Sequence, residues 1–583
     1  MHRRHFLSAI PLARAPFVFA QQGPPEAARV ESLTAPPRPA LAINHLGFRP
    51  GSPKIVILRR TGGPAPTEFQ LRDIGFDRWQ QVRPLQRADG DFGEALSGDF
   101  SDVQRPGMYQ VRAGGELSVP FFIRADVWRR TLPKAVGYYR AQRCGTAAPN
   151  VHPVCHLDEA RRRDNGVHID TTGGWHDAGD LRKWIGVTML NGVALLNLAR
   201  NLGETWNEDG SGLAPRLEEV RWGNRYFLKM QDADGQVWND VGGGVNGDNS
   251  DNRWTNNVIG DADDRFINTS KSSQNQAIFV TLEAMAAQAF RTVDFEYSRR
   301  CLAAARRCWE GAERSPAARV LGWWTLAAIE LFRATGEAAF RDAALRAGNE
   351  LLSLQEMAHV GSQGSIRGFW RTSPSDPSPY ADAVYSAFPP LALLELARAF
   401  PDDPGRPRWL DAVRAHLDEY VTPMSERSVY RIVPFGVFLG SPTPERYRPL
   451  EGQLTYRYFH PVRRQFWWLG MTSHLECYAL LLARAAQAFA QDAYRHLAYR
   501  QLEWVMGANP FGACLMTGEG MRNPYPHSRY AGLIVGGLMN GIAGNTEDEP
   551  VLDMEYGFDW RTTEYWSPHN AFYIWANSVL EQG

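Results

Sequence analysis

The sequence predicts a mostly helical protein that carries a small β-sandwich near its N-terminus. Short segments in which polar and apolar residues alternate extend from about Leu41 to Ala125, whereas helical periodicity begins after Trp128. The chain of 583 residues is also too long for one ordinary hydrophobic core, so at least two domains are expected. These observations together place a β domain in front of a much larger α domain.

The first 20 residues, MHRRHFLSAIPLARAPFVFA, predict an export signal. A twin arginine, Arg3 and Arg4, precedes a short apolar run that ends at the small residue Ala20. Proline and arginine interrupt this run, which is too short to span a membrane. We therefore expect a twin-arginine signal over residues 1–20, a linker over 21–38, and a mature protein that is periplasmic or secreted.

Residues 39–126 carry the strand pattern. The segments KIVILRR, TEFQLRD, GMYQVRA and LSVPFFI alternate with period two in several places, and turns that contain glycine or proline separate them. A series of short strands of this kind is typical of a small β-sandwich of the immunoglobulin-like type.

Residues 127–583 predict many helices joined by long loops. Segments such as TMLNGVALLNLARNL, NQAIFVTLEAMAAQAF and HLECYALLLARAAQAFA have helical periodicity, and almost no strand pattern interrupts them. An α/α toroid, in which helix hairpins form two rings, would close so many helices; a solenoid would also fit, but no fixed-period repeat is visible. The long loops 231–274, 356–385 and 422–466 would then build a cleft at one end.

The charge balance argues against polyanionic partners. The net charge is −1, from 63 Lys and Arg against 64 Asp and Glu, with no basic stripe. We therefore expect neither nucleic acid nor a membrane surface as a partner, and we expect a soluble monomer. The 19 tryptophans serve either a large core or a groove in which flat rings stack on sugars.

Six cysteines remain to be explained in a chain that is expected to be exported. Cys301 and Cys308 lie two helical turns apart in CLAAARRC, which separates their Cα atoms by about 10 Å and puts them beyond disulfide reach. We expect both to be buried as small apolar residues. Cys144 and Cys155 allow two interpretations, a disulfide or a metal site.

Two segments place carboxylates where acid–base chemistry would need them. In GGWHDAGD, Asp177 and Asp180 lie three residues apart, as a pair that holds and deprotonates a water would; helix capping is the alternative. Glu564 lies among Trp560, Tyr565 and Trp566, where apolar surroundings would raise its pKa and let it act as a general acid. The alternative for Glu564 is a helix-entry residue that the helix dipole favours.

A third segment, NPYPHSRYAG, presents His527 and Arg529 from a proline-rich loop. This loop would offer one hydrogen-bond donor and one cation to a ligand. The alternative for Arg529 is an ordinary surface charge.

These segments together resemble glycoside hydrolase family 9, and within it the subgroup with an N-terminal immunoglobulin-like domain. The matching segments extend almost from end to end: NHLGFRPGSPKIVIL, YYRAQRCG, CHLDEA, GGWHDAGD, GANPFG, NPYPHSR and DWRTTEYWSPHNA. The resemblance implies an (α/α)6 barrel over residues 127–583. It also implies inverting hydrolysis of β-1,4-glucosidic bonds in cellulose or a related β-glucan, as an endoglucanase would perform it.

The resemblance also implies roles for individual residues. Asp180 would be the general base that activates water, Asp177 would bind and orient that water, and Glu564 would be the general acid. His527 and Arg529 would contact the sugar on the non-reducing side of the scissile bond. Further aromatic candidates for sugar binding are Trp254, Trp370, Tyr458, Trp560, Trp467 and Trp468, the last two with core packing as the alternative.

Three departures from the family pattern leave the substrate open. Thr563 stands where the family usually has asparagine, Trp560 where it has tyrosine, and Ser528 where the doubled histidine would continue. One alternative is an exo-acting β-glucosidase or glucosaminidase on short β-linked oligosaccharides, with loop 356–385 closing one end of the cleft. Another is a carbohydrate-binding protein without activity.

Two metals enter as expectations. The resemblance implies a structural zinc on Cys144, Cys155, His156 and His176, a complete tetrahedral set of two thiolates and two imidazoles; the disulfide between the two cysteines stays open as the alternative. The run DNSDNRWTNNVIGDADDR, from Asp248 to Arg265, is rich in the oxygen ligands that calcium prefers. A solvated loop is the alternative for that run.

Overall fold

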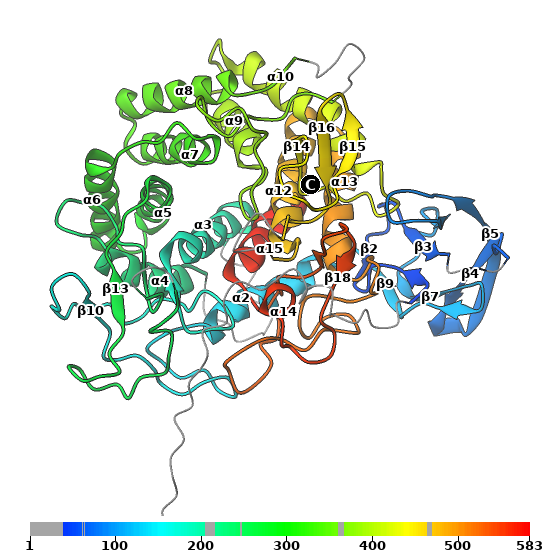
Figure 1. The fold of residues 1–583 in the computed structure, drawn as a ribbon, viewed down its shortest axis with the longest axis horizontal. Helices are drawn as coiled ribbons and strands as arrows, with labels where there is room; N and C mark the ends of the chain where they lie inside the picture. The colour runs from blue at the N-terminus through cyan, green and yellow to red at the C-terminus, as the bar shows by residue number, and fades with distance from the viewer. Residues whose placement is uncertain are drawn as a thin grey trace, which may run out of the picture.

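The computed structural model describes residues 39–582 except 61, 63, 204–215, 245–247, 359–365 and 463–468. The predicted signal and linker therefore lie outside the described residues. The described chain forms a β domain beside a larger helical domain, as predicted (Figure 1). No described helix is long and apolar enough to cross a membrane.

The β domain is one sheet that folds over on itself. Its strands are β1 (Leu41–Ala42), β2 (Gly47–Phe48), β3 (Ile55–Arg59), β4 (Glu68–Asp73), β5 (Arg78–Arg87), β6 (Ala95–Asp99), β7 (Gly107–Ala113), β8 (Glu116–Leu117) and β9 (Phe121–Ile123). Their order is β1-β3-β6-β5-β4-β7-β9-β2, with β8 on β7. The long strand β5 pairs with β4 up to Pro84 and with β6 from Leu85 onward, so it passes from one half of the sandwich to the other.

Alternation along these strands builds the core of the β domain. Val56 and Leu58 of β3 point into this core, as do Phe69 and Leu71 of β4. Gln70 between the latter two is partly exposed, whereas Ile57 is fully buried and packs in the core of the helical domain. The four inward residues share one apolar cluster that is separate from the core of the helical domain. A two-sided sandwich with its own core is what the period-two pattern predicted.

Six helices of the described chain contact one another in a closed ring. They are α3 (Ile185–Leu202), α5 (Ser273–Phe290), α7 (Ala318–Thr335), α9 (Phe388–Ala399), α12 (Thr472–Phe489) and α15 (Ser567–Leu580). Each contacts the next, and α15 contacts α3 (Figure 1). These helices are buried on most sides, which explains why their sequences are apolar almost throughout.

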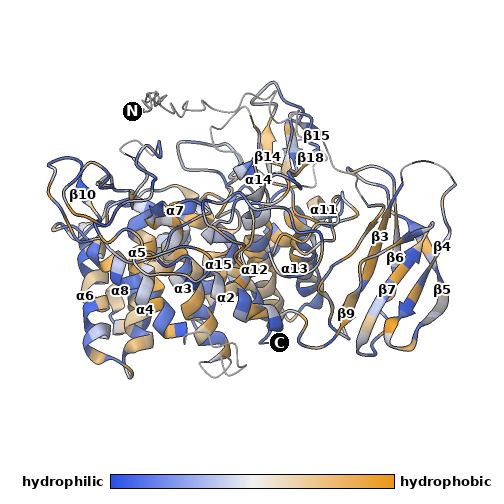
Figure 2. Cartoon of the chain, turned by 90° about the horizontal axis from the view of Figure 1, so that it is seen from below, coloured by the Kyte–Doolittle hydropathy of each residue, from blue (hydrophilic) through white to orange (hydrophobic). Residues whose placement is uncertain are grey.

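A second helix packs on the outside of each ring helix. The outer helices are α2 (Leu132–Ala141), α4 (Arg216–Lys229), α6 (Phe295–Gly311), α8 (Ala338–Ser353), α10 (Arg406–His416) and α13 (Asp492–Val505). The shorter helices α11 (Thr422–Ser425) and α14 (Trp560–Thr563) lie within loops. In Figure 2 the helices stand side by side, and the loops with their short strands gather along one edge of the domain.

The loops contain short strands that the sequence did not predict. One sheet has the order β10-β13-β12-β11 and joins Arg161–Arg162, Phe266–Asn268, Asp240–Val241 and Lys183–Trp184. A second sheet comprises β14 (Gly436–Leu439), β15 (Arg448–Glu451) and β16 (Leu454–Arg457), and a third comprises β17 (Ala543–Gly544) and β18 (Pro550–Val551). Strands of two to four residues are too short to show alternation, so these sheets arise from tertiary pairing.

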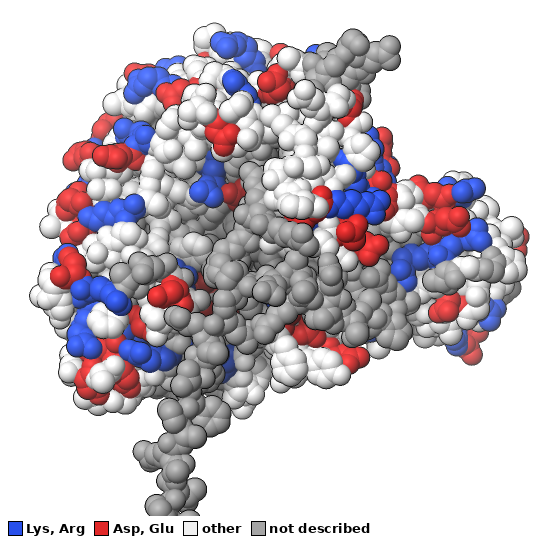
Figure 3. All heavy atoms as spheres, in the orientation of Figure 1, with Lys and Arg blue, Asp and Glu red and all other residues white. Residues whose placement is uncertain are grey.

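The six cysteines are all buried free thiols, which confirms the expectation for Cys301 and Cys308 and leaves Cys144 and Cys155 unpaired with each other. Acidic and basic side chains intermix over the coloured parts of the face in Figure 3, as the net charge of −1 suggests.

Candidate functional site

The predicted catalytic residues meet at one pocket in the helical domain. The pocket has a volume of about 300 Å³ and is lined by Asp177, Ala178, Asp180, Arg182, Asp248, Asn249, Asn252, Leu469, His527, Arg529, Asn540, Trp560, Glu564 and Trp566. Six of the residues singled out from the sequence are in this set: the three carboxylates, His527, Arg529 and Trp560. Residues far apart in the chain are thus brought to one surface.

Backbone hydrogen bonds join the three segments that carry these side chains. The Gly179 amide donates to the Tyr565 carbonyl at 2.8 Å, and the Arg529 amide donates to the Gly179 carbonyl at 2.8 Å. The His527 amide donates to the Thr563 carbonyl at 3.2 Å. A Cβ atom on residue 179 would lie 2.4 Å from the His527 carbonyl oxygen, so only glycine permits this close approach.

Asp177 is buried at the base of the pocket. Its Oδ1 accepts a hydrogen bond from the Trp184 amide at 3.0 Å, and its Oδ2 accepts one from Trp566 Nε1 at 3.2 Å. Burial raises the pKa of Asp177 well above its usual range, and the negative charge of Asp180 raises it further. The N-terminal cap of α3 is Trp184, and its side chain makes no capping hydrogen bond, so neither aspartate caps that helix and the capping alternative is wrong.

Asp180 is held in a different way. Its Oδ1 accepts a hydrogen bond from the Arg182 amide at 3.0 Å, which closes a local turn. Its Oδ2 accepts one from Asn252 Nδ2 at 2.8 Å. Asn252 in turn accepts a bond from the Leu181 amide at 3.1 Å through its own side-chain oxygen. The side chain of Asp180 is therefore fixed from both sides and stays open to the pocket.

Glu564 follows α14 directly and adopts an extended backbone conformation. Burial raises the pKa of Glu564 well above its usual range, and the negative charges of Asp180 and Asp177 raise it further. The positive charge of Arg529 acts in the opposite direction. Because Trp566 is the N-terminal cap of α15 and its first turn holds no acidic residue, the helix-entry explanation of Glu564 is wrong.

His527 and Arg529 form one side of the pocket. His527 Nδ1 lies 2.8 Å from the Gly557 carbonyl oxygen and donates to it, which leaves Nε2 available. An Arg529 guanidinium nitrogen donates to the Asn252 carbonyl oxygen. Asn252 thus contacts both Asp180 and Arg529, although it was not singled out in the sequence. It lies among several asparagines and aspartates, and no local pattern distinguishes it.

Only some of the aromatic candidates for sugar binding lie at the pocket. Trp560 lines the pocket. Trp370 is only 2% exposed and its Nε1 donates to the Leu351 carbonyl, and Tyr458 is 0% exposed and donates its hydroxyl to Asp91 of the β domain. A ring buried inside the protein cannot stack on an incoming sugar, so the expectation for Trp370 and Tyr458 is corrected.

Trp254 lies outside the pocket, beside the thiol and imidazole cluster. It is 39% exposed, and its ring stacks on the His156 ring at 5.8 Å between centroids with an angle of 8° between planes. The ring covers the cluster of thiols and imidazoles and is not among the residues that line the pocket. The remaining two candidates, Trp467 and Trp468, lie outside the described residues.

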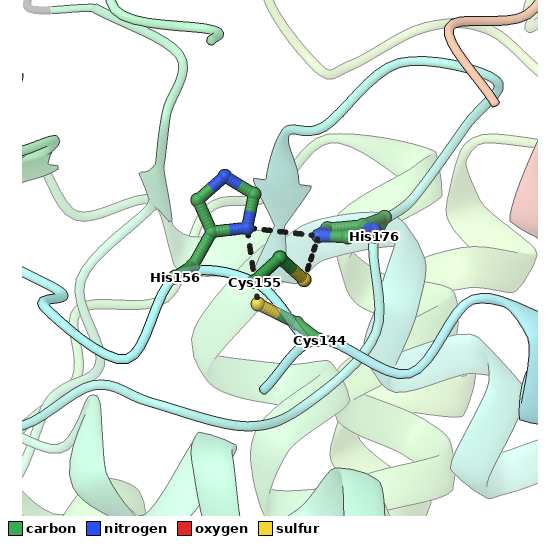
Figure 4. Close-up of side chains that lie close together, drawn as sticks. All are labelled: Cys144, Cys155, His156 and His176. Carbon is green, nitrogen blue, oxygen red and sulfur yellow. Dashed lines mark hydrogen bonds between the residues drawn. The ribbon is translucent and has the colours of Figure 1, made fainter. Parts of the chain in front are cut away.

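Cys144, Cys155, His156 and His176 form a compact buried cluster (Figure 4). One ligand atom from each residue lies within 4.8 Å of all the others. His156 Nδ1 is 3.6 Å from Cys144 Sγ and 3.4 Å from His176 Nε2, and Cys155 Sγ is 3.9 Å from the same His176 atom. Two sulfurs and two nitrogens at these separations fit around one tetrahedral zinc.

In both histidines, the ring nitrogen that points away from the cluster makes a hydrogen bond, so the other ring nitrogen can bind zinc. His156 Nε2 donates to the Arg253 carbonyl oxygen at 3.0 Å, so Nδ1 keeps its lone pair toward the cluster. His176 Nδ1 lies 2.9 Å from the Tyr530 hydroxyl, and that hydroxyl donates to the Asp180 carbonyl oxygen, also at 2.9 Å. Tyr530 therefore connects the cluster to the backbone of Asp180, a contact that the sequence did not predict.

Comparison with known families agrees with the site. A model described as glycosyl hydrolase family 9 matches residues 128–534, and one described as a cellulase N-terminal Ig-like domain matches residues 37–118. Endoglucanase D of Acetivibrio thermocellus is 30% identical over 237 residues, 38% of this chain and 37% of that protein. The xyloglucan-specific endo-beta-1,4-glucanase BoGH9A of Bacteroides ovatus is 22% identical over 552 residues, 85% of this chain and 84% of that protein.

Solved structures agree on the fold. A metagenome-derived family 9 endoglucanase superposes with a TM-score of 0.70 at 22% identity, over 92% of this chain and 98% of the other. A structure described as the Zn-binding triple mutant of the family 9 endoglucanase J30 gives 0.67 at 23% identity, over 91% of this chain and 99% of the other. Since the family model covers more than half of its length, the chain belongs to glycosyl hydrolase family 9.

Proposed function

We propose that this protein is an inverting glycoside hydrolase that cleaves β-1,4-glucosidic bonds of cellulose or a related β-glucan in the manner of an endoglucanase. The observation that carries this proposal is the meeting of Asp177, Asp180 and Glu564 at one pocket. Endoglucanase D and the xyloglucan-specific enzyme of Bacteroides ovatus, both relatives of this chain, support the substrate class.

Glu564 is suited to be the general acid. Burial and two neighbouring carboxylates raise its pKa, so it keeps its proton closer to neutral pH than an ordinary glutamic acid does. It would transfer that proton to the glycosidic oxygen as the bond from this oxygen to the anomeric carbon breaks. The departing sugar then leaves as a neutral alcohol.

Asp180 is suited to be the general base. Its carboxylate is oriented by Asn252 and by the Arg182 amide, and it faces the same pocket as Glu564. A water placed between Asp180 and Asp177 would attack the anomeric carbon from the side opposite the leaving oxygen, while Asp180 accepts its proton. The configuration at the anomeric carbon is then inverted. Glu564 is left deprotonated and Asp180 protonated, and proton exchange with solvent restores both for the next turnover.

The pocket wall supplies sugar contacts. His527 Nε2 and the guanidinium of Arg529 would donate to hydroxyl oxygens of the sugar, and the Trp560 ring would face the sugar plane. Arg529 has a second function in this scheme, because its charge limits how far the pKa of Glu564 rises. This wall includes Trp560, where the chain departs from the family pattern, and the carbonyl of Thr563, the second departure, accepts the His527 amide behind it.

We further propose a domain organisation that agrees with these assignments. The closed ring with its outer helices corresponds to an (α/α)6 barrel, in a catalytic domain over residues 127–583 behind an immunoglobulin-like domain over 39–126. Residues 1–20 would direct export through the twin-arginine route, residues 21–38 would follow as a linker, and the mature chain would act outside the cytoplasm as a monomer on its glucan.

Zinc would be held by Cys144, Cys155, His156 and His176. Four protein ligands leave no open coordination position, so the metal would supply structure and no catalytic step. The cluster includes the residue directly before Asp177, and through Tyr530 it contacts the Asp180 backbone. Its role would be to fix the position of both aspartates.

A product analysis tests the proposed activity. The purified full-length protein is incubated with cellulose, xyloglucan, cello-oligosaccharides and chito-oligosaccharides, alongside the Glu564→Gln variant. Release of several short products from internal bonds of a β-1,4-glucan, lost by at least about 100-fold in the variant, is the expected result. Release of single sugars from chain ends only would favour the exo-acting alternative, and binding of glucan without any product would favour a carbohydrate-binding protein.

A further inference from the structure

We propose that Tyr556 and Phe558 form a platform that binds sugar units of a neutral β-glucan outside the pocket. Phe558 is 81% exposed and Tyr556 is 62% exposed. Their rings stack on each other, with 5.6 Å between the centroids and 13° between the planes. Neither residue is among those that line the pocket with Asp180 and Glu564, so the platform would extend the binding surface beyond it.

The turn that carries both rings is fixed by one buried carboxylate, that of Asp553. Its Oδ1 accepts hydrogen bonds from the amides of Glu555 and Tyr556 at 3.2 and 3.1 Å. Its Oδ2 accepts hydrogen bonds from the amides of Phe558 and Asp559 at 2.8 and 3.2 Å. Because four backbone amides are bound to one side chain, the backbone that presents the rings is ordered before any ligand arrives, which lowers the entropic cost of binding.

Gly557, between the two aromatic residues, connects the turn to the wall of the pocket. Its carbonyl oxygen accepts the hydrogen bond from His527 Nδ1 at 2.8 Å. Its φ is 61°, and a Cβ atom here would lie 2.9 Å from the Pro526 carbonyl oxygen, so this contact requires glycine. The turn directly precedes α14, whose first residue, Trp560, lines the pocket (Figure 1). The two rings therefore lie next to the proposed sugar-binding wall.

The form of this pair suits a sugar ring. A single exposed aromatic residue needs no explanation, but two stacked rings on a turn held by four hydrogen bonds form an ordered apolar surface. Stacking covers one face of each ring, and exposure of this size leaves other ring surface open to solvent. The C–H groups on the flat face of a glucose unit carry partial positive charge, which packs favourably on the negative face of an aromatic ring.

The charges near the rings favour a neutral glycan over an acidic one. The charged side chains from Asp553 to Asp559 are all acidic, and the third of them is Glu555. Asp559 is paired with Arg561, whereas the described ion pairs include neither Asp553 nor Glu555. A uronic acid bound at the platform would meet like charges, so we assign the platform to unsubstituted glucose units.

The position beside His527 gives the platform a direction along the glucan. His527 is proposed to contact the sugar on the non-reducing side of the scissile bond, so the platform would hold units further toward the non-reducing end. This direction rests on the proposed hydrolase function, and it adds a preference for longer chains. Chains too short to reach the rings gain nothing from them.

The dependence of the kinetics on chain length tests the platform. Initial rates on cellotriose and cellohexaose are measured for the full-length wild type, Phe558→Ala and Tyr556→Ala. Each variant is expected to lower kcat/KM for cellohexaose by about 10-fold, mostly through KM, and to leave kcat/KM for cellotriose within about twofold of wild type. Phe558→Trp keeps a flat ring and should behave like the wild type. The matched control is Phe76→Ala, which removes a ring that is 65% exposed in the β domain.

Calorimetry with cellohexaose measures binding apart from turnover, in Glu564→Gln with and without Phe558→Ala; the double variant should bind about 10-fold more weakly. Equal effects on both oligosaccharides, or none, would overturn the platform and leave the hydrolase standing. Binding that depends on Phe558, without hydrolysis by the wild type, would support the platform and overturn the proposed function. Neither binding nor hydrolysis would overturn both. Self-association of the wild type that Phe558→Ala abolishes in size-exclusion chromatography would assign the rings to a second copy of the chain and overturn the platform.

Discussion

The side-chain amide of Asn252 donates to Asp180 Oδ2 at 2.8 Å, and no other side chain is seen to hold that carboxylate in the described structure. Asn252 also receives a hydrogen bond from Arg529 through its backbone carbonyl. One loop residue thus places the proposed base relative to the proposed sugar-binding cation.

Replacing Asn252 should therefore affect kcat more than folding. Asn252→Ala is expected to lower kcat by about 10- to 100-fold, because a misplaced base costs that much. Asn249→Ala is the control, because this neighbour lines the same pocket and contacts Arg182 at 3.4 Å but not Asp180. An equal loss in both variants would contradict the role of Asn252.

Replacing Arg529 should shift the alkaline limb of the pH–rate profile. Glu564 acts in its protonated form, so activity falls as pH rises through the pKa of Glu564, which the charge of Arg529 lowers. Arg529→Ala removes that charge and should move the limb to higher pH, whereas Arg529→Lys keeps the charge and should leave the limb near its wild-type position. A limb that moves to lower pH in Arg529→Ala would show that Glu564 is not the group observed.

Glu564 should also destabilise the fold at neutral pH. Its folded-state pKa lies above the unfolded value, so the folded state holds the proton more tightly, and stability is lost as pH rises from the unfolded pKa to the folded one. Glu564→Gln removes this cost and should raise Tm at pH 7. Near pH 4 the gain should vanish. A gain that is the same at both pH values would point to packing and not to protonation.

Substitutions that disturb the zinc cluster should also lower the activity that depends on Asp177 and Asp180. His176→Ala is expected to lower both zinc content and activity, because the ligand directly precedes Asp177. Tyr530→Phe keeps all four ligands but removes the hydroxyl between His176 and the Asp180 carbonyl. It should weaken zinc binding by about 10- to 100-fold and lower kcat. Metal analysis and kinetics of the two variants, with the exposed Tyr525→Phe as the control, check both effects; an unchanged rate in His176→Ala would separate the two sites.

The sequence predicted the parts of the site that local motifs carry. GGWHDAGD places Asp177 and Asp180 near each other whatever the fold, whereas the set of Cys144, Cys155, His156 and His176 came from the family resemblance. Glu564 needed the family resemblance, because a lone glutamate among aromatics has many explanations. Family membership and the helical and β domains are confirmed.

The rest depended on tertiary contacts that no short segment encodes. Asn252 contacts Asp180 only because the loop after β12 folds back onto the segment from Asp180 to Arg182, ahead of α3. Trp370 and Tyr458 look like any other aromatic residue of the loops, and only the packed structure shows that His416 and Asp91 are their partners.

The anomeric form of the first product tests the central assignment most directly. Proton NMR of a cello-oligosaccharide digest, recorded within the first minutes, distinguishes the α-anomer from the β-anomer before mutarotation mixes them. With Asp180 activating water opposite Glu564, the new reducing end should appear first as the α-anomer. Initial formation of the β-anomer would mean retention, and would contradict the assignment of Asp180 as a base that activates water.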